Sequence, residues 1–80
     1  MTLGKIRHNL TFKDTVDGAG RVFDGMDITA EFLNSCGRTS TISFHYDYYS
    51  NDLRGLVERA LVYHLEGKGI PKNYSNITVE

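Results

Sequence analysis

The stretch LRGLVERALVYHL, residues 53–65, carries the clearest periodicity in the chain. Its apolar side chains recur at intervals of three and four residues, which places them along one side of an α-helix. Ser50, Asn51 or Asp52 can cap the start of this helix, and Gly67 can supply the left-handed residue that ends it. Because one amphipathic helix needs an apolar surface to cover, the segments around it are expected to form a sheet. The predicted apolar stripe consists of Leu53, Leu56, Val57, Ala60, Leu61, His64 and Leu65.

Three segments before the helix alternate between apolar and polar residues, as half-buried β-strands do. They are residues 5–13, 22–32 and 39–49. Turn-forming residues separate them at 14–20 and at 34–37. Asp24-Gly25 interrupts the alternation of the second strand, and a glycine at such a place often marks a β-bulge. We predict an antiparallel meander of three strands with a mobile loop at 14–20.

A short final strand, residues 75–80, is predicted after the helix, because Ile77 and Val79 alternate with polar residues. The helix is expected to run back along the sheet, so this strand should lie parallel to its neighbour, either the first strand or the third, and form an edge. Eighty residues provide one hydrophobic core. The predicted fold is a single α+β domain, residues 1–80, of order β-β-β-α-β, in which the helix covers one face of the meander.

The composition is that of a globular domain, with 40% hydrophobic residues, 24% charged residues and a formal net charge of −1. That charge provides no bulk attraction to nucleic acid or to an anionic membrane. Cys36 is the only cysteine, so an internal disulfide is excluded and a reducing compartment, the cytoplasm, is expected. We predict neither a signal peptide nor a membrane-spanning segment, and therefore a soluble protein.

The titratable residues do not form a pattern typical of catalysis, of a cofactor site or of a metal site. His8, His45 and His64 are far apart in the sequence. His8 and His64 belong to the sets predicted to face the core, where helix-on-sheet packing could join them as a buried neutral pair. Cys36 is expected to be a surface thiol without a positioned base. We therefore predict that the protein is not an enzyme and holds neither a cofactor nor a metal.

The predicted contact surface is the face of the sheet opposite the helix, together with the loop 14–20 and the exposed edge of the sheet. It carries a basic stripe on the first strand, and the acidic residues beside this stripe suit cross-strand ion pairs. Exposed tyrosines add to it, because tyrosine is enriched at protein interfaces. Many of these residues would also suit an ordinary solvated face. The candidate partner-binding residues are Lys5, Arg7, Lys13, Asp27, Glu31, His45, Asp47, Tyr49, Tyr63 and Tyr74.

The order β-β-β-α-β in so short a chain resembles that of several phage-encoded inhibitors, among them some anti-CRISPR proteins, which bind a host complex stoichiometrically. This resemblance of size and layout implies a non-enzymatic protein-binding module that occludes a surface of a larger host protein or nucleoprotein complex. One alternative is a nucleic-acid-binding domain that uses Lys5, Arg7 and Lys13. The other is a homodimeric structural subunit joined through an exposed edge strand.

Overall fold

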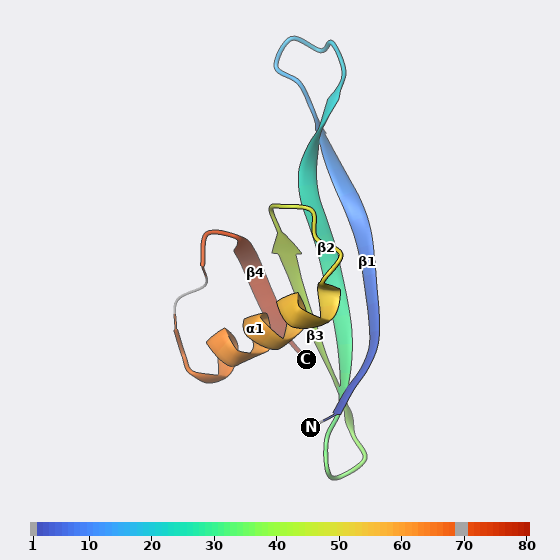
Figure 1. Ribbon diagram of the computed structural model, residues 1–80, viewed down its shortest axis with the longest axis vertical. Coiled ribbons are helices and arrows are strands. Elements are labelled where there is room, and N and C mark those ends of the chain that lie inside the picture. Colours follow the sequence, from blue (N-terminus) through green and yellow to red (C-terminus); the bar gives the residue numbers. More distant parts are fainter. Residues whose placement is uncertain (1, 69–70) are drawn as a thin grey trace.

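The computed structural model describes residues 2–68 and 71–80 (Figure 1). The strands form one antiparallel sheet in the order β1-β2-β3-β4, and the helix lies across one of its faces (Figure 1). This confirms the predicted α+β class and the predicted order of elements. The five elements are β1 (Thr2–Asp14), β2 (Arg21–Leu33), β3 (Thr39–Tyr46), α1 (Leu53–Leu65) and β4 (Tyr74–Val79).

The core lies between α1 and the side of the sheet that faces it. Alternate residues of each strand point toward the helix, because neighbouring side chains of a strand face opposite sides. The register of β2 with β3 places Ala30 opposite Ile42 and Ile28 opposite Phe44, which brings the two apolar sets onto the same side. The buried residues are Met26, Ile28, Ala30, Phe32, Ile42, Phe44, Leu56, Val57, Ala60 and Tyr74.

The helix α1 begins and ends at the predicted residues. The side chain of Asp52 accepts a hydrogen bond from the backbone N–H of Gly55 at 3.1 Å, which satisfies a donor of the first turn. Gly67 follows the last turn with a φ of +68°, the left-handed conformation that directs the chain away from a helix. The last turn reaches past β4 (Figure 1), and there His64 and Leu65 are exposed. Among residues 2–68 and 71–80, no helix is long and apolar enough to span a membrane.

The direction predicted for the last strand is wrong, because β4 runs antiparallel to β3. Tyr74 lies opposite Tyr46, and Val79 lies opposite Ile42. The cause is the course of α1, which crosses the sheet instead of running back along it (Figure 1). The chain therefore re-enters the sheet beside the end of β3 from which it left. Residues 69 and 70, part of the predicted loop before this strand, lie outside the described residues.

The bounds of two strands also differ from the prediction. β3 ends at Tyr46, three residues before the predicted end at 49. Tyr48, predicted to face inward, is consequently exposed, because the alternation of a strand no longer applies to it. β4 begins at Tyr74, one residue before the predicted start at 75.

The first hairpin extends past the rest of the sheet. β1 and β2 are 13 residues long and β3 only 8. The molecule measures 51 × 24 × 21 Å, and its long dimension follows this hairpin (Figure 1). The predicted bulge lies where the hairpin leaves the sheet: Gly25 is opposite Thr11 and Phe23 is opposite Phe12, so Asp24 is the extra residue.

Candidate interaction surface

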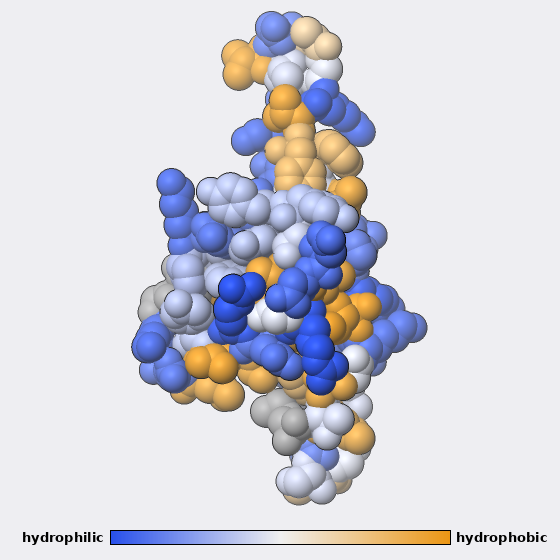
Figure 2. Space-filling view, in the orientation of Figure 1, coloured by the Kyte–Doolittle hydropathy of each residue, from blue (hydrophilic) through white to orange (hydrophobic). Residues whose placement is uncertain are grey.

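The end of the first hairpin projects from the sheet as a two-stranded arm, residues 11–25 (Figure 1). In the part of the chain that the structure describes, its strands pair only with each other, because the pairing of β2 with β3 begins at Met26. Phe12 and Phe23 lie side by side across the arm, with ring centroids 6.1 Å apart in an edge-to-face arrangement. Their side chains are 52% and 39% exposed. Figure 2 shows apolar atoms along the arm, outside the body of the molecule.

The apolar surface of the arm extends beyond the phenylalanine pair. Leu10, at the base of the arm and on the same side, is 45% exposed, and Val16 at the tip is fully exposed. Val22, which is 42% exposed, lies opposite Lys13 and therefore on the other side of the ribbon. Burying an apolar side chain of this size stabilises by about 1.5–3 kcal/mol, which the isolated chain does not gain at these positions. Adjacent exposed apolar side chains on a projecting element are typical of an interaction surface.

The tip of the arm is a hydrogen-bonded loop. The backbone N–H of Thr15 donates to the carbonyl oxygen of Gly20 at 2.9 Å, which closes the loop. The carboxylate of Asp17 accepts hydrogen bonds from the backbone N–H of Ala19 and from the hydroxyl of Thr15, and these bonds, the first above all, lower the pKa of Asp17. The loop thus presents Val16 from a defined backbone. Its predicted mobility stays a prediction.

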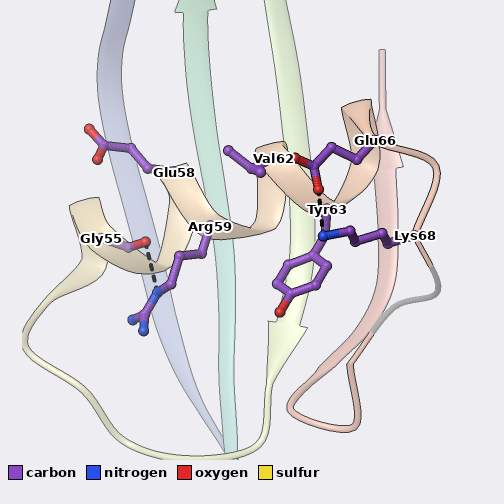
Figure 3. Close-up of a pocket in the computed structure, with 7 residues that line it drawn as sticks. All are labelled: Gly55, Glu58, Arg59, Val62, Tyr63, Glu66 and Lys68. Carbon is purple, nitrogen blue, oxygen red and sulfur yellow. Dashed lines mark hydrogen bonds and ion pairs between the residues drawn. The ribbon is translucent and has the colours of Figure 1, made fainter.

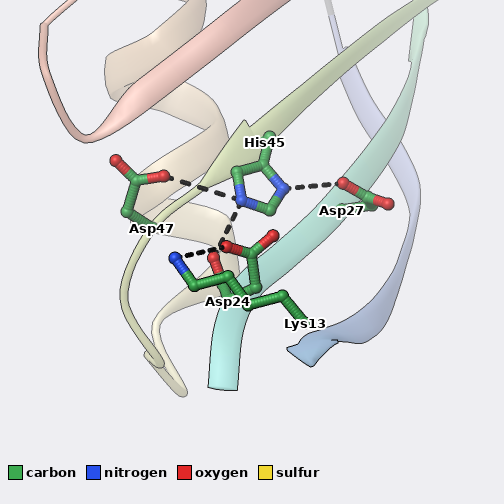
Figure 4. Close-up of polar contacts among 5 residues, drawn as sticks. All are labelled: Lys13, Asp24, Asp27, His45 and Asp47. Carbon is green, nitrogen blue, oxygen red and sulfur yellow. Dashed lines mark hydrogen bonds and ion pairs between the residues drawn. The ribbon is translucent and has the colours of Figure 1, made fainter. Parts of the chain in front are cut away.

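His45 connects β3 to the base of the arm (Figure 4). Its Nδ1 lies 2.8 Å from Oδ1 of Asp27, and its Nε2 lies 3.0 Å from the backbone carbonyl oxygen of Asp24. Asp47 Oδ1 is 3.6 Å from the same Nε2. Lys13 Nζ, from β1, is 3.6 Å from Oδ1 of Asp24. The fold thus brings four of the candidate residues together around the bulge.

The surroundings of His45 favour its protonated form. The hydrogen bond to Asp27 raises the pKa of His45 above the usual histidine value, and the Asp24 carbonyl and the charges of both aspartates act in the same direction. Partial burial of the ring opposes this shift, since desolvation disfavours the charged form. The side chain is 20% exposed, so it is accessible to protons from solvent.

The basic stripe predicted on β1 is partly neutralised by β2. Arg7 Nη2 lies 3.3 Å from Oε1 of Glu31, which confirms the predicted cross-strand pairing of opposite charges, and Lys13 contacts Asp24. Exposed pairs of this kind contribute about 0.2–1 kcal/mol each. Lys5 is exposed near the start of the strand. A stripe whose charges are paired in this way is a poor track for a phosphate backbone.

The three candidate tyrosines differ in their placement. Tyr49 is exposed, as predicted, and Tyr63 is half-buried beside the core. Tyr74 is 6% exposed, so the prediction that it is available to a partner is wrong. Its ring packs on Phe44 and Tyr46 with centroids 5.5 and 5.3 Å away, because β4 begins at Tyr74 and turns that side chain inward. Burial raises the pKa of the Tyr74 hydroxyl.

The outer side of α1 carries a shallow groove of about 470 Å³ (Figure 3). Val62 lies on the side of the helix opposite the predicted apolar stripe and is half exposed. It contributes an apolar wall to the groove. Lys68 Nζ lies 2.9 Å from Oε2 of Glu66 and 5.8 Å from the centre of the Tyr63 ring. The charged groups are thus directed at their neighbours along the rim and do not converge on one point in the groove. The lining residues are Gly55, Glu58, Arg59, Val62, Tyr63, Glu66 and Lys68.

The two other histidines do not form the predicted buried pair. His8 and His64 are both exposed. β1 is an edge strand that contacts the core only through Leu3 and Ile6, so His8 lies on the helix side of the sheet without being covered. Within the described ranges, His, Cys, Asp and Glu side chains form no group of three or more that could hold a metal ion. Cys36 is exposed in its turn, as predicted.

Apart from Val16, which lies in the predicted contact loop 14–20, the apolar residues of the arm are absent from the predicted contact set. Leu10 and Phe12 were assigned to the covered side of the first strand, and they do lie on the side that faces the helix. Alternation shows which side a residue faces, but it does not show how far the covering helix reaches. The predicted strand lengths contained no such signal, because the third predicted strand, 39–49, is as long as the second, 22–32. The arm lacks support because β3 ends at Tyr46.

The chain was also compared with models of protein families, with curated proteins and with solved structures. None of these comparisons found a match. The features from which a function can be argued are therefore the arm, the His45 cluster and the mixed charges of the outer face.

Proposed function

We propose that this protein is a non-enzymatic binding module that docks on a larger protein through its arm. The observation that carries the proposal is the exposed pair of Phe12 and Phe23 on a ribbon that no third strand among residues 2–68 and 71–80 supports. A lone two-stranded ribbon is only marginally stable in water, so a partner that covers its apolar side would stabilise it as well as bind it. Aromatic side chains at the centre of an interface commonly supply most of its binding energy.

Ion pairs on the arm contribute the polar rim of the proposed interface. Lys13 with Asp24 and Asp14 with Arg21 place both signs of charge beside the apolar side chains. A polar rim around an apolar centre is the usual anatomy of protein interfaces. Because these charges are already paired within the chain, they would determine orientation and association rate more than affinity.

The finer proposal is that docking inhibits the partner by occlusion. Its support is the resemblance in size and element order to phage-encoded inhibitors, anti-CRISPR proteins among them, and the suitability of a projecting arm for entering a cleft. The test is phage plating on a bacterial host that carries a CRISPR or other defence system. Expression of the protein should raise the plating efficiency, and expression of the Phe12→Ser, Phe23→Ser variant should not.

The docking proposal is tested by affinity capture from such a host with the native protein and with the Phe12→Ser, Phe23→Ser variant. A stoichiometric partner should be retained by the native chain and lost from the variant. The control is Leu65→Ser, which removes an apolar side chain that is even more exposed, 65%, from the far end of α1. Equal capture by all three proteins would refute a role for the arm.

Self-association through the arm is separated from docking by sedimentation of the purified protein. A monomer at micromolar concentration agrees with docking on a different protein. A dimer that the double serine variant converts to a monomer would instead support the homodimeric alternative.

A further inference from the structure

Both ring nitrogens of His45 face groups that can only accept hydrogen bonds. Nδ1 is 2.8 Å from the carboxylate of Asp27, and Nε2 is 3.0 Å from the backbone carbonyl of Asp24. A neutral imidazole carries one N–H and one bare nitrogen, so it can satisfy only one of these acceptors. The arrangement is complete only when the ring is an imidazolium that donates from both nitrogens.

The second acceptor lies at the hinge of the arm. Asp24 is the extra residue of the bulge, the position at which β2 leaves the support of β3. The backbone beside it packs directly on the ring: a Cβ on Gly25 would lie 2.7 Å from Nε2. His45 thus holds the backbone of β2 at the last place where the arm can be fastened to the third strand (Figure 4).

We propose that His45 is a proton-operated clamp on the arm. In the imidazolium form it binds Asp27 and the Asp24 carbonyl together and fixes the base of the arm against β3. On loss of the proton, the remaining N–H stays on Nδ1 and donates to the stronger acceptor, the Asp27 carboxylate. The bare Nε2 then faces the Asp24 carbonyl, which releases the bulge and loosens the arm. The clamp acts within the chain and requires no partner.

The charges around the ring determine the direction of the response. Asp27 and Asp24 of β2 and Asp47 after β3 face the ring, and Lys13 of β1 approaches it through Asp24. On the β4 side, the residue opposite His45 is the uncharged Ser75. The hydrogen bond to Asp27 is the largest of the influences that raise the pKa of His45 in the folded protein, and the Asp24 carbonyl and the charges of Asp27 and Asp24 add to it. The clamp is therefore closed below the usual histidine pKa of about 6.5 and opens as the pH rises through the folded value.

Two measurements on the purified protein test the clamp. An NMR titration of the imidazole carbon shifts yields the pKa of His45 in the folded protein, and the same titration in denaturant yields its value in the unfolded chain. Amide hydrogen exchange, corrected for its intrinsic pH dependence, yields the opening equilibrium of the arm. The opening equilibrium should rise tenfold for each unit by which the folded pKa exceeds that of the unfolded chain.

Three variants isolate the contacts. Asp27→Asn removes the carboxylate and should lower the pKa of His45 and shrink the pH response of the arm. His45→Gln should abolish the response and leave the arm open at every pH. Asp14→Asn makes the same chemical change elsewhere on the arm, where Asp14 pairs with Arg21, and should leave the titration unchanged.

The clamp is overturned by either of two results. One is a His45 that titrates at or below the value of the unfolded chain. The other is arm exchange that, after correction, does not change across the titration of His45. Both outcomes are independent of whether the arm docks on another protein, because the free chain is measured.

Discussion

The two ends of the β1–β2 hairpin have the same alternating pattern but different surroundings. In the body, Met26 and Ile28 are covered by α1 and are at most 1% exposed. In the arm, Phe12 and Phe23 lie on the same two strands, yet both are more than a third exposed. The difference arises from the neighbours, because β3 ends at Tyr46 and the helix crosses the sheet below the arm.

This comparison indicates that the stabilising core and the proposed binding surface lie in separate parts of one hairpin. The body contains the large buried side chains and should therefore supply nearly all of the free energy of unfolding. The arm contributes little to that core and keeps its apolar side chains available. Substitutions in the two regions should consequently have different effects, and the predictions below run from the largest expected effect to the smallest.

The largest effect is expected from a substitution that leaves a cavity in the core beneath α1. Leu56→Ala should lower the free energy of unfolding by about 2–5 kcal/mol, because Leu56 is 1% exposed and its removal leaves a cavity. Leu65→Ala, on the same helix but 65% exposed, should change it by no more than about 0.5 kcal/mol. Urea denaturation followed by circular dichroism measures both. Similar losses at the two leucines would break the distinction between covered and uncovered surface.

The next effect is expected at the boundary between body and arm. Gly25→Ala should lower the free energy of unfolding by about 2–3 kcal/mol. The φ of Gly25 is +130°, and the new Cβ would meet the Tyr46 carbonyl oxygen and the His45 ring. Gly18→Ala is the control. Gly18 also has a positive φ, +71°, but among the described residues no atom beyond its chain neighbours lies within 4 Å of an added Cβ. The free energy of unfolding should therefore fall by only about 1 kcal/mol. Equal losses of stability in the two variants would show that the backbone of the bulge leaves room for a Cβ.

A smaller effect is expected at the N-cap of α1, the helix that covers the body. Asp52→Ala should lower the free energy of unfolding by about 1 kcal/mol, because the backbone N–H of Gly55 loses its acceptor. Asp52→Asn should restore most of that loss, since asparagine is an equally good N-cap. Thermal unfolding of both variants and of the native chain measures the two effects. An alanine variant as stable as the native chain would refute the capping role of Asp52.

The sequence was sufficient where local patterns determine the structure. The helix bounds, the N-cap, the bulge at Asp24-Gly25 and the two turns all follow from spacing and from residue type. The direction of β4 could not be predicted, because it depends on the angle at which α1 crosses the sheet, which no local pattern records. Tyr74 was assigned to a loop for the same reason, since its burial depends on where β4 rejoins β3.

The candidate surface was predicted less well than the fold. Lys13, Asp27 and His45 were correctly placed on one face, since alternation and register determine that much. Asp47 follows the end of β3, so its position beside His45 comes from the turn after the strand and not from alternation. That they meet around the Asp24 carbonyl depends on the bulge, whose geometry shifts β2 by one residue against β1. The apolar surface of the arm was missed because burial is a property of the neighbours and not of the strand itself.

The smallest predicted effect concerns the arm alone. A double-mutant cycle with Phe12→Ala and Phe23→Ala should yield a coupling energy of about 0.5 kcal/mol in the free protein, the lower end for aromatic pairs, because both rings remain partly hydrated. Bound to a partner that covers them, the same pair should couple more strongly, since desolvation then adds to the contact between the rings. Chemical denaturation measures the first value, and the affinities of the four proteins measure the second. A coupling energy above about 1.5 kcal/mol in the free chain would mean that the arm already has a core of its own, and the contrast between body and arm would then be wrong.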